Sequence, residues 1–356
     1  MIQLNGSHGE GGGSIARVAL ALSTLLRKPF SISAIRQNRP QPGLKNQHLY
    51  CIKALQKLCN AQAVGADLGS LNLSYIPGIF KGKKIEVDIE TAGSIPLFCQ
   101  AVILPALFAD KTTTLTVTGG TDGKWASSFD YFKEVFLPTL SRFADVECRL
   151  LRRGYYPKGQ GKAELKIKPH LHFADSLLSE IQGSIKPYLL GSKGTIVHIK
   201  GISHASAELE QAHVAERQAK SAKLVLAAAN CPVSIHCEYQ RTESIGSGIT
   251  LWAAFENPSR RSEMITIGSD TLGEKGKRAE VVGMEAAQEL MGYIKSDAAI
   301  DVHLADQILP YMALLPESAI RTSKITDHMR SNIYTITHFL NATYTINEND
   351  CIITVP

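Results

Sequence analysis

Three stretches of the chain follow the same order of a turn, an apolar helical pattern and a strand pattern. The helical patterns cover 15–28, 95–111 and 304–315. The first two open on Gly-Ser-Ile, and the last two share Ile-Leu-Pro at 103–105 and 308–310, where proline is expected to end or kink the helix. Repeated units of this kind stack their apolar faces into a common core. The sequence therefore predicts an α+β fold built from repeats.

The repeat pattern is interrupted between residues 184 and 276. A strand pattern, a long helical pattern and two further strand patterns follow one another there, at 196–199, 207–229, 233–236 and 249–255. This order predicts a small inserted α/β domain at 184–276, with a repeat-built core formed by 1–183 and 277–356. A chain of 356 residues is long enough for two such domains.

The composition is that of an ordinary globular protein, with 44% hydrophobic and 20% charged residues. No run approaches the roughly 20 apolar residues that cross a bilayer, and no basic-then-apolar leader opens the chain. We therefore expect no membrane association and no secretion. Seven scattered cysteines without a Cys-x-x-Cys pair suit reduced thiols in the cytoplasm. The net charge of +5 permits a polyanionic partner without requiring one.

Five glycines fall within the eight positions 6–13, directly before the first helical pattern. Glycine clusters mark places where bare backbone approaches a ligand closely, and the first turn of a helix binds anions. Ser14 is expected to cap this helix, Glu10 offers a metal or proton ligand, and Arg17 can pair with a phosphate. The alternative is a glycine-rich loop that binds nothing.

Two clusters of basic residues stand out. Arg36, Arg39 and Lys45 form one, and a second surrounds Tyr155 and Tyr156, namely Arg152, Arg153, Lys158 and Lys162. Basic side chains interleaved with tyrosines can hold a phosphate backbone and stack bases. An ordinary solvated turn explains either cluster equally well.

The last helical pattern begins after Thr326 or Asp327, either of which can cap it and place His328 in the first turn. The positive end of the helix disfavours imidazolium there, which leaves a neutral nucleophilic nitrogen near neutral pH. Such a histidine can attack a nucleotide α-phosphate and form a phosphoramidate. The alternative is a capped helix with an incidental histidine.

Over nearly its full length the chain resembles the RNA 3′-terminal phosphate cyclase family. No single motif is unique to that family, but their number and order are specific. The matching pieces are Gly-Glu-Gly-Gly-Gly at 9–13 with Arg17, Arg-Gln-Asn-Arg at 36–39, Gln-His-Leu at 47–49, Ala-Gly-Ser at 92–94 with Gln100, Gly-Gly-Thr-Asp at 119–122, Arg-Gly-Tyr-Tyr-Pro at 153–157, His-Val-Ala-Glu-Arg at 213–217, Leu-Ala-Asp-Gln at 304–307, and His328 with Ser-Asn-Ile at 331–333.

The resemblance implies a large core of β-α-β-α-β-β units with a smaller α/β insert. It also implies an ATP-dependent ligase with a divalent metal, Mg or Mn, that acts on RNA with a 3′-phosphate end. The family's chemistry has three steps: ATP adenylylates a histidine, AMP moves to the RNA 3′-phosphate, and the 2′-OH displaces AMP to leave a 2′,3′-cyclic phosphate. No obligate protein partner is implied.

Site residues carry over by position. The resemblance makes His328 the adenylylated catalytic histidine and Glu10 the metal-linked acid. Positions that bind phosphates or the RNA end are Arg17, Arg39, Gln47 and His48. Positions that bind ATP are Gln100, His303, Leu304, Ala305, Asp306 and Gln307.

The chain departs from the family pattern at three positions. His303 stands where tyrosine is common, Ser127 lies near the place of a missing proline, and Gln160 replaces a third glycine. These departures concern nucleotide affinity and choice rather than reaction class. Three other functions stay open: a non-catalytic cyclase-like protein of ribosome biogenesis, an enolpyruvyl transferase with similar repeats, and an RNA-binding module. His328 together with Glu10 argues against the first of these.

Overall fold

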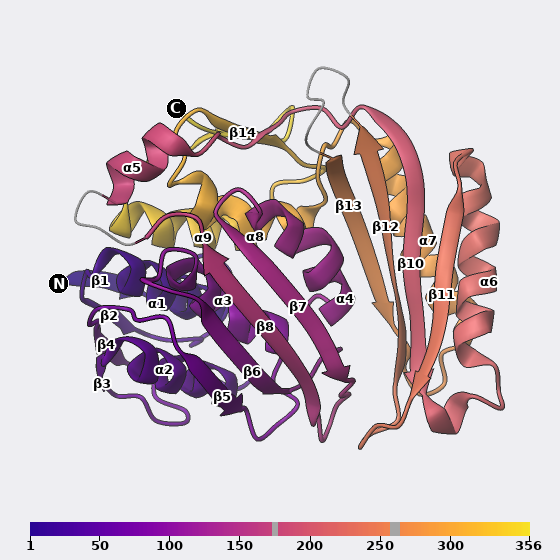
Figure 1. Cartoon of the computed structure of the whole chain (residues 1–356), viewed down its shortest axis with the longest axis horizontal. Coiled ribbons are helices and arrows are strands. Elements are labelled where there is room, and N and C mark those ends of the chain that lie inside the picture. The colour runs from indigo at the N-terminus through magenta and orange to yellow at the C-terminus, as the bar shows by residue number, and fades with distance from the viewer. Residues whose placement is uncertain (173–176, 257–263) are drawn as a thin grey trace.

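The computed structural model describes residues 1–172, 177–256 and 264–356. It confirms an α+β architecture with four mixed four-stranded sheets (Figure 1). Within those ranges, none of the helices combines the length and apolar character that crossing a bilayer requires.

The first two sheets repeat one β-α-β-α-β-β unit. In each, the first two strands pair in parallel and the last two join antiparallel, so the spatial order of strands is 1-2-4-3. The first unit contains β1 (Ile2–Asn5), α1 (Ser14–Leu26), β2 (Phe30–Ser33), α2 (Asn46–Cys59), β3 (Gln62–Val64) and β4 (Leu73–Ile76). The second contains β5 (Lys84–Asp88), α3 (Ile95–Ala106), β6 (Thr113–Gly119), α4 (Phe129–Tyr131) with the π-helical and 3₁₀ turns Phe132–Phe136 and Leu137–Leu140, β7 (Ala144–Arg152) and β8 (Gly161–Pro169).

The third unit has the same order but is split. Its first strand is β9 (Leu189–Leu190), which pairs in parallel with β14 (Ser318–Arg321). The remaining elements are α8 (Val302–Met312), α9 (Asp327–Phe339), β15 (Thr345–Asn347) and β16 (Ile352–Val355). Helix α5 (Leu177–Ser184) precedes it. Pro105 and Pro310 lie in the last turns of α3 and α8, as expected of helix-ending prolines.

The fourth sheet lies between β9 and α8 in the chain. Its strands are β10 (Thr195–Ser206), β11 (Val233–Gln240), β12 (Ser247–Glu256) and β13 (Met264–Leu272). Helices α6 (Val214–Leu226) and α7 (Ala279–Lys295) pack against each other and against this sheet. The expected helix at 207–229 is shorter, because single 3₁₀ turns flank α6.

These contacts group the chain differently from the predicted insert at 184–276 at both ends. Strand pairing joins β9 to the third repeat unit, and packing joins α7 to the fourth sheet. The domain limits themselves stay a prediction.

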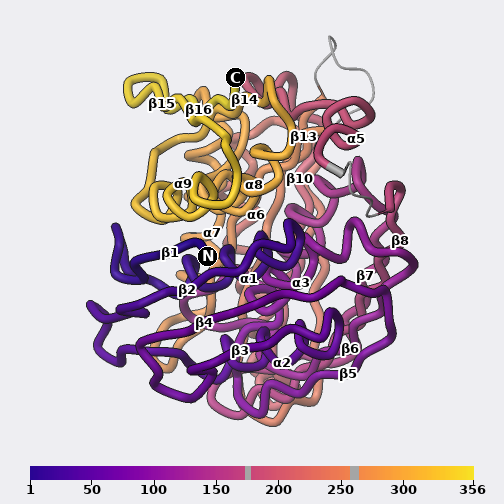
Figure 2. Tube along the Cα trace, turned by 90° about the vertical axis from the view of Figure 1, so that its left-hand side faces the viewer, coloured from indigo at the N-terminus to yellow at the C-terminus, as the bar shows by residue number. Residues whose placement is uncertain are grey.

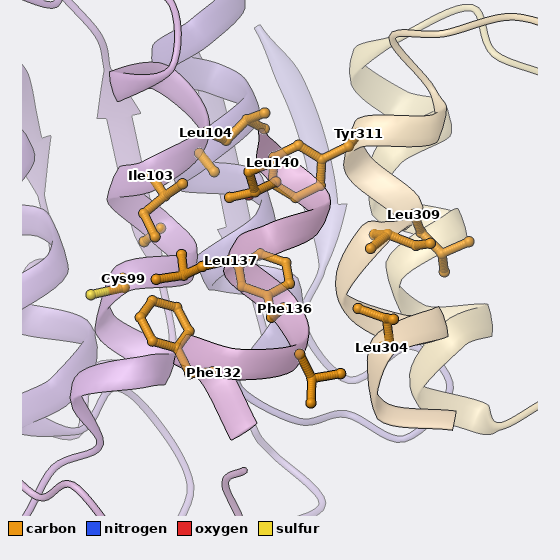
Figure 3. Close-up of a cluster of buried hydrophobic side chains, with 14 of the residues drawn as sticks. Cys99, Ile103, Leu104, Phe132, Phe136, Leu137, Leu140, Leu304, Leu309 and Tyr311 are labelled. Carbon is orange, nitrogen blue, oxygen red and sulfur yellow. The ribbon is translucent and has the colours of Figure 1, made fainter. Parts of the chain in front are cut away.

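The core of the repeat units is a continuous layer of buried apolar side chains. In Figure 3, Leu304 and Tyr311 of α8 face the aromatic turn 132–140, and Leu309 lies on the opposite side of α8. Phe132, Phe136 and Leu304 are at most 2% exposed. Burying such side chains contributes about 1.5–3 kcal/mol each before entropy is counted.

The C-terminal helix α9 lies beside β1 and α1 at the opposite end of the sequence (Figure 2). The loops that follow the parallel strands β1 and β2 reach the start of α9, because Glu10 contacts His328 and Arg39 contacts Glu10. Ligand sites form preferentially at the carboxyl ends of parallel strands.

Candidate functional site

The glycine loop after β1 packs on α9. The backbone N–H of Glu10 donates to Ser331 Oγ at 3.2 Å, and the ring of His8 stacks on Tyr334 with centroids 3.8 Å apart. Gly9 has φ of +57°, and a Cβ built there would lie 2.6 Å from Ser331 Oγ. Glycine is required at position 9 for both conformation and space.

His328 faces the glycine loop from the first turn of α9. Thr326 caps the helix by accepting from the N–H of Met329 at 3.2 Å. His328 Nε2 lies 2.6 Å from Glu10 Oε2, and Arg39 contacts the other oxygen of the same carboxylate. The structure therefore brings the predicted nucleophile, the predicted acid and a predicted phosphate ligand into direct contact.

The pKa of His328 is lowered from its ordinary value. Burial is the largest cause, and the positive charges of Arg17 and Arg39 add to it, whereas Asp327 opposes the shift. The direction agrees with the neutral imidazole expected from the helix terminus. A neutral ring keeps a lone pair available for attack on phosphorus.

The side chain of His48 places its Nε2 against the backbone of the same loop at Gly13. Its Nδ1 accepts from the backbone N–H of Lys45 at 3.0 Å, so the neutral ring carries its proton on Nε2. A Cβ on Gly13 would lie 2.3 Å from that Nε2 and 3.1 Å from Arg17 Nη1. Burial, followed by the charge of Arg17, lowers the pKa of His48 to about 3, which keeps the ring neutral.

Near the glycine loop lie several buried polar atoms that have no hydrogen-bond partner among the described residues, and we call this group the donor-lined pocket. Most are donors: Arg36 Nε, Arg39 Nε, Gln47 Nε2, His48 Nε2 and Ser14 Oγ. Unsatisfied buried donors are costly, so their concentration in one place indicates a ligand that accepts hydrogen bonds. A phosphate group is such a ligand.

The expected cap at Ser14 is wrong. The N-cap position is Gly13, no side chain caps α1, and Ser14 is its first helical residue. The hydroxyl of Ser14 is thus left to the pocket rather than to the helix end.

Helices α3 and α8 each join the site through one polar pair. Arg17 Nε donates to Gln100 Oε1 at 3.4 Å, and Asn332 Nδ2 of α9 donates to Asp306 Oδ1 at 2.8 Å. Burial raises the pKa of Asp306 to about 6, and Arg17 works in the opposite direction. The Asp306–Asn332 contact fixes α8 against the helix that carries His328.

The four other predicted ATP positions on α8 are oriented differently from one another. The side chains of Leu304 and Ala305 are buried in the core, so only their backbone groups are available to a nucleotide. His303 is exposed, with its ring centroid 6.1 Å from that of Tyr131. Gln307 has a buried Oε1 without a hydrogen-bond partner among the described residues.

Arg153 corrects one sequence interpretation, because it is only 1% exposed and is not available to RNA. Its guanidinium binds three carboxylates, those of Glu238 at 2.6 Å, Asp130 at 2.7 Å and Asp122 at 3.2 Å. Asp122 also lies 3.3 Å from Nε2 of His204. The network joins the second repeat unit to β10 and β11. Sequence reasoning missed it because its partners are scattered along the chain.

Two groups of side chains are candidates for binding a divalent cation. Ligand atoms of Asp122, Asp130 and His204 lie within 4.8 Å of one another, but the Arg153 guanidinium already neutralises these carboxylates. Glu10 is the better fit, because Oε2 is buried and, among the described residues, forms an ion pair only with the titratable His328, while Arg39 binds the other oxygen. Mg²⁺ typically uses one or two carboxylates together with substrate phosphates, and the donor-rich pocket beside Glu10 suits those phosphates.

The chain is similar to known proteins over its whole length. Residues 8–346 match the family model described as RNA 3'-terminal phosphate cyclase. A protein of that name from Archaeoglobus fulgidus is 43% identical over 99% of this chain and 100% of its own. Proteins of the same name from Pyrococcus furiosus and Methanosarcina mazei are 41% and 38% identical, covering 97% and 98% of this chain and 95% and 98% of their own.

A core of three repeat units with unpartnered buried donors beside a first-turn histidine has the chemistry that suits phosphorylated ligands. The chain belongs to the RNA 3′-terminal phosphate cyclase family. The enolpyruvyl transferase and the simple RNA-binding module have no support from these relatives.

Proposed function

We propose that this protein converts an RNA 3′-terminal phosphate to a 2′,3′-cyclic phosphate at the expense of ATP, through a covalent His328–AMP intermediate. The observation that carries this proposal is the contact between His328 and Glu10 beside a pocket of unpartnered donors. Family membership gives the reaction class, and the residues give the route.

In the first step, the neutral ring of His328 carries its proton on Nδ1, so Nε2 is released from Glu10 and forms a bond to the α-phosphorus of ATP. The bond from that phosphorus to the bridging oxygen breaks, pyrophosphate leaves, and the ring proton passes to solvent. The lowered pKa of His328 supports this step, because protonated imidazole has no lone pair at the attacking nitrogen.

In the second step, a 3′-phosphate oxygen of the RNA attacks the same phosphorus and the N–P bond breaks. This leaves RNA joined to AMP through a phosphoanhydride. In the third, the 2′-OH attacks the terminal RNA phosphorus, AMP departs with the anhydride oxygen, and the hydroxyl proton goes to solvent. The adjacent hydroxyl has a high effective concentration, so positioning supplies much of the rate.

The residues of the pocket have separate tasks in this proposal. His48 Nε2–H, Gln47 and Arg17 bind phosphate oxygens, and Arg39 holds Glu10 in place. Glu10 would hold a divalent cation, which supplies charge neutralisation of the phosphates during transfer. Asp306 and Gln307, with His303 at the mouth, are the proposed contacts of the nucleotide.

The seven cysteines are all free thiols, which is compatible with the cytoplasmic location predicted above. RNA with a 3′-phosphate end is the proposed substrate.

The test is the conversion of an oligoribonucleotide with a 3′-phosphate in the presence of ATP and Mg²⁺ or Mn²⁺, followed by separation of the cyclic product. We expect product with ATP and none without it. An oligonucleotide that carries a 3′-OH serves as control and should stay unchanged. A wild-type protein that leaves the 3′-phosphate intact would contradict the proposal and favour the non-catalytic alternative.

A further inference from the structure

Four loops meet at one end of the molecule, where the second repeat unit adjoins the fourth sheet. They are 122–127, 152–160, 241–247 and 273–275, which we call the four-loop surface. Asp122 and Tyr155 form a parallel bridge, and the N–H of Lys158 donates to Ser244 Oγ at 3.1 Å. The β7–β8 turn and the loop before β12 lie side by side at the lower edge of Figure 1.

This surface exposes two large aromatic side chains. Trp125 is 87% exposed and Tyr156 is 77% exposed, and Ile245 in the neighbouring loop is 65% exposed. Trp125 also has φ of +78°, a conformation that a bulky residue rarely adopts. Exposed aromatic rings that share one surface indicate a binding role, because burial in the core does not explain them.

The same loops are positively charged. The exposed cations are Lys124, Arg152, Lys158, Arg241 and Lys275, and they outnumber the two exposed carboxylates, Glu274 and Glu243, which form surface ion pairs with Lys124 and Lys158. Lys124 Nζ lies 5.6 Å from the centre of the Trp125 ring. Cations interleaved with exposed aromatic rings form the typical surface for single-stranded nucleic acid, in which bases stack and phosphates pair.

Residues 91–93 connect the four-loop surface with Gln47 of the donor-lined pocket. A Cβ on Gly159 would lie 2.7 Å from Ala92 Cα, and a Cβ on Gly93 would lie 3.5 Å from Gln47 Cβ. The segment 91–93 is thus the single layer between the turn that carries Tyr156 and the residue proposed to bind the RNA end. A nucleic-acid strand whose end lies at Gln47 can cross residues 91–93 and reach the rings of Trp125 and Tyr156.

We propose that the four-loop surface binds the single-stranded RNA segment that precedes the reacting 3′ end. Trp125 and Tyr156 stack on its bases, and Lys124, Arg152 and Lys158 pair with its phosphates. This inference rests on the proposed function for the identity of the polymer. Base stacking tolerates every sequence, so the surface reads the single-stranded state rather than a sequence.

The chain has two tryptophans, and the second, Trp252, is 9% exposed on β12. A Trp252→Phe variant therefore reports on Trp125 alone. The experiment titrates this variant with a single-stranded oligoribonucleotide that ends in a 3′-OH, without ATP, so that binding is measured apart from reaction. We expect quenching of Trp125 fluorescence, and roughly a tenfold or greater loss of affinity for each of Trp125→Ala and Tyr156→Ala, measured by anisotropy of a labelled oligonucleotide. Leu224→Ala, at a 74% exposed position of α6, is the matched control and should bind as the wild type does.

Four outcomes are decisive. Loss of oligonucleotide affinity in the two aromatic variants, with unchanged affinity for ATP, supports the surface. Quenching of Trp125 by ATP alone, with no effect of RNA, overturns it and assigns the ring to the nucleotide. Wild-type affinity in both variants, in a protein that does cyclise RNA, overturns the surface while the proposed function stands. If the protein does not cyclise RNA but the two variants still lose affinity, the surface stands and the proposed function falls.

Discussion

Replacing His48 by asparagine tests the electrostatics of the donor-lined pocket through stability alone. Asparagine can still accept from the N–H of Lys45 with its side-chain oxygen, but it does not titrate. In the wild type, burial and the charges of Arg17, Arg36 and Lys45 lower the pKa of His48 to about 3. The unfolded chain has the ordinary value near 6.5.

The sign follows from proton binding. Between about pH 6.5 and pH 3 the unfolded state binds a proton at His48 that the folded state excludes. The free energy of unfolding therefore falls as the pH falls through this window. Integrating between pH 7 and pH 5 gives a loss of about 2 kcal/mol from this one group.

The assay is urea denaturation of the wild type and His48→Asn at several pH values from about 5 to 7. We expect the wild type to lose about 2 kcal/mol more stability than the variant over this range. His236→Asn removes an exposed histidine from β11 and serves as the matched control, with the wild-type profile expected. Parallel profiles for the wild type and His48→Asn would refute the inference that His48 is held neutral by its surroundings.

Three further changes test other contacts. Gly9→Ala should destabilise the protein by at least about 1–2 kcal/mol, because Gly9 has a positive φ and lies close to the Ser331 hydroxyl. Gly292→Ala, in open space on α7, should raise stability by about 0.5–1 kcal/mol. Thermal unfolding compares the two variants, and an equal effect would contradict the geometry. Arg153→Met should lower the free energy of unfolding, measured in urea, by about 3–5 kcal/mol, because it leaves buried carboxylates unpaired. Arg152→Met, at the exposed neighbouring position, should change it by less than about 0.5 kcal/mol. Similar values for both variants would count against the network. Glu10→Gln should raise the Mg²⁺ concentration needed for half-maximal cyclisation by about tenfold or more, since an amide is a weaker ligand than a carboxylate. Asp327→Asn is the control and should leave this concentration unchanged. An unaltered Mg²⁺ requirement in Glu10→Gln would place the cation elsewhere.

The repeat architecture was predictable because the spacing of apolar residues along the chain indicates each helix and strand locally. Helix and strand patterns of 15–26 and 30–33 arise from neighbours in the chain, and proline ends α3 and α8 by sterics alone. Strand β9 has only two residues, too few for any periodicity, so its place in the third unit shows only in the pairing with β14. Helix α7 resembles the core helices in sequence, and only tertiary contacts associate it with the fourth sheet.

The site was predictable where chemistry lies in short motifs. The glycine loop and the capped first turn with His328 both appear as expected. The contact between His328 and Glu10 was not predictable from local pattern, because it joins the two ends of the chain. Arg153 was misassigned for the same reason: a sequence shows a cation, but only the fold shows the three carboxylates that bury it.

The direct test of the central claim is the location of AMP on the protein. The wild type and His328→Ala are incubated with ATP labelled at the α-phosphate, in the presence of Mg²⁺ or Mn²⁺ and without RNA. We predict a label in the wild type that is lost in acid and stable in base, as a phosphoramidate is, that maps to the peptide containing His328, and that is absent from the variant. A wild type that cyclises RNA without taking up label, or a variant labelled as strongly as the wild type, would contradict the account.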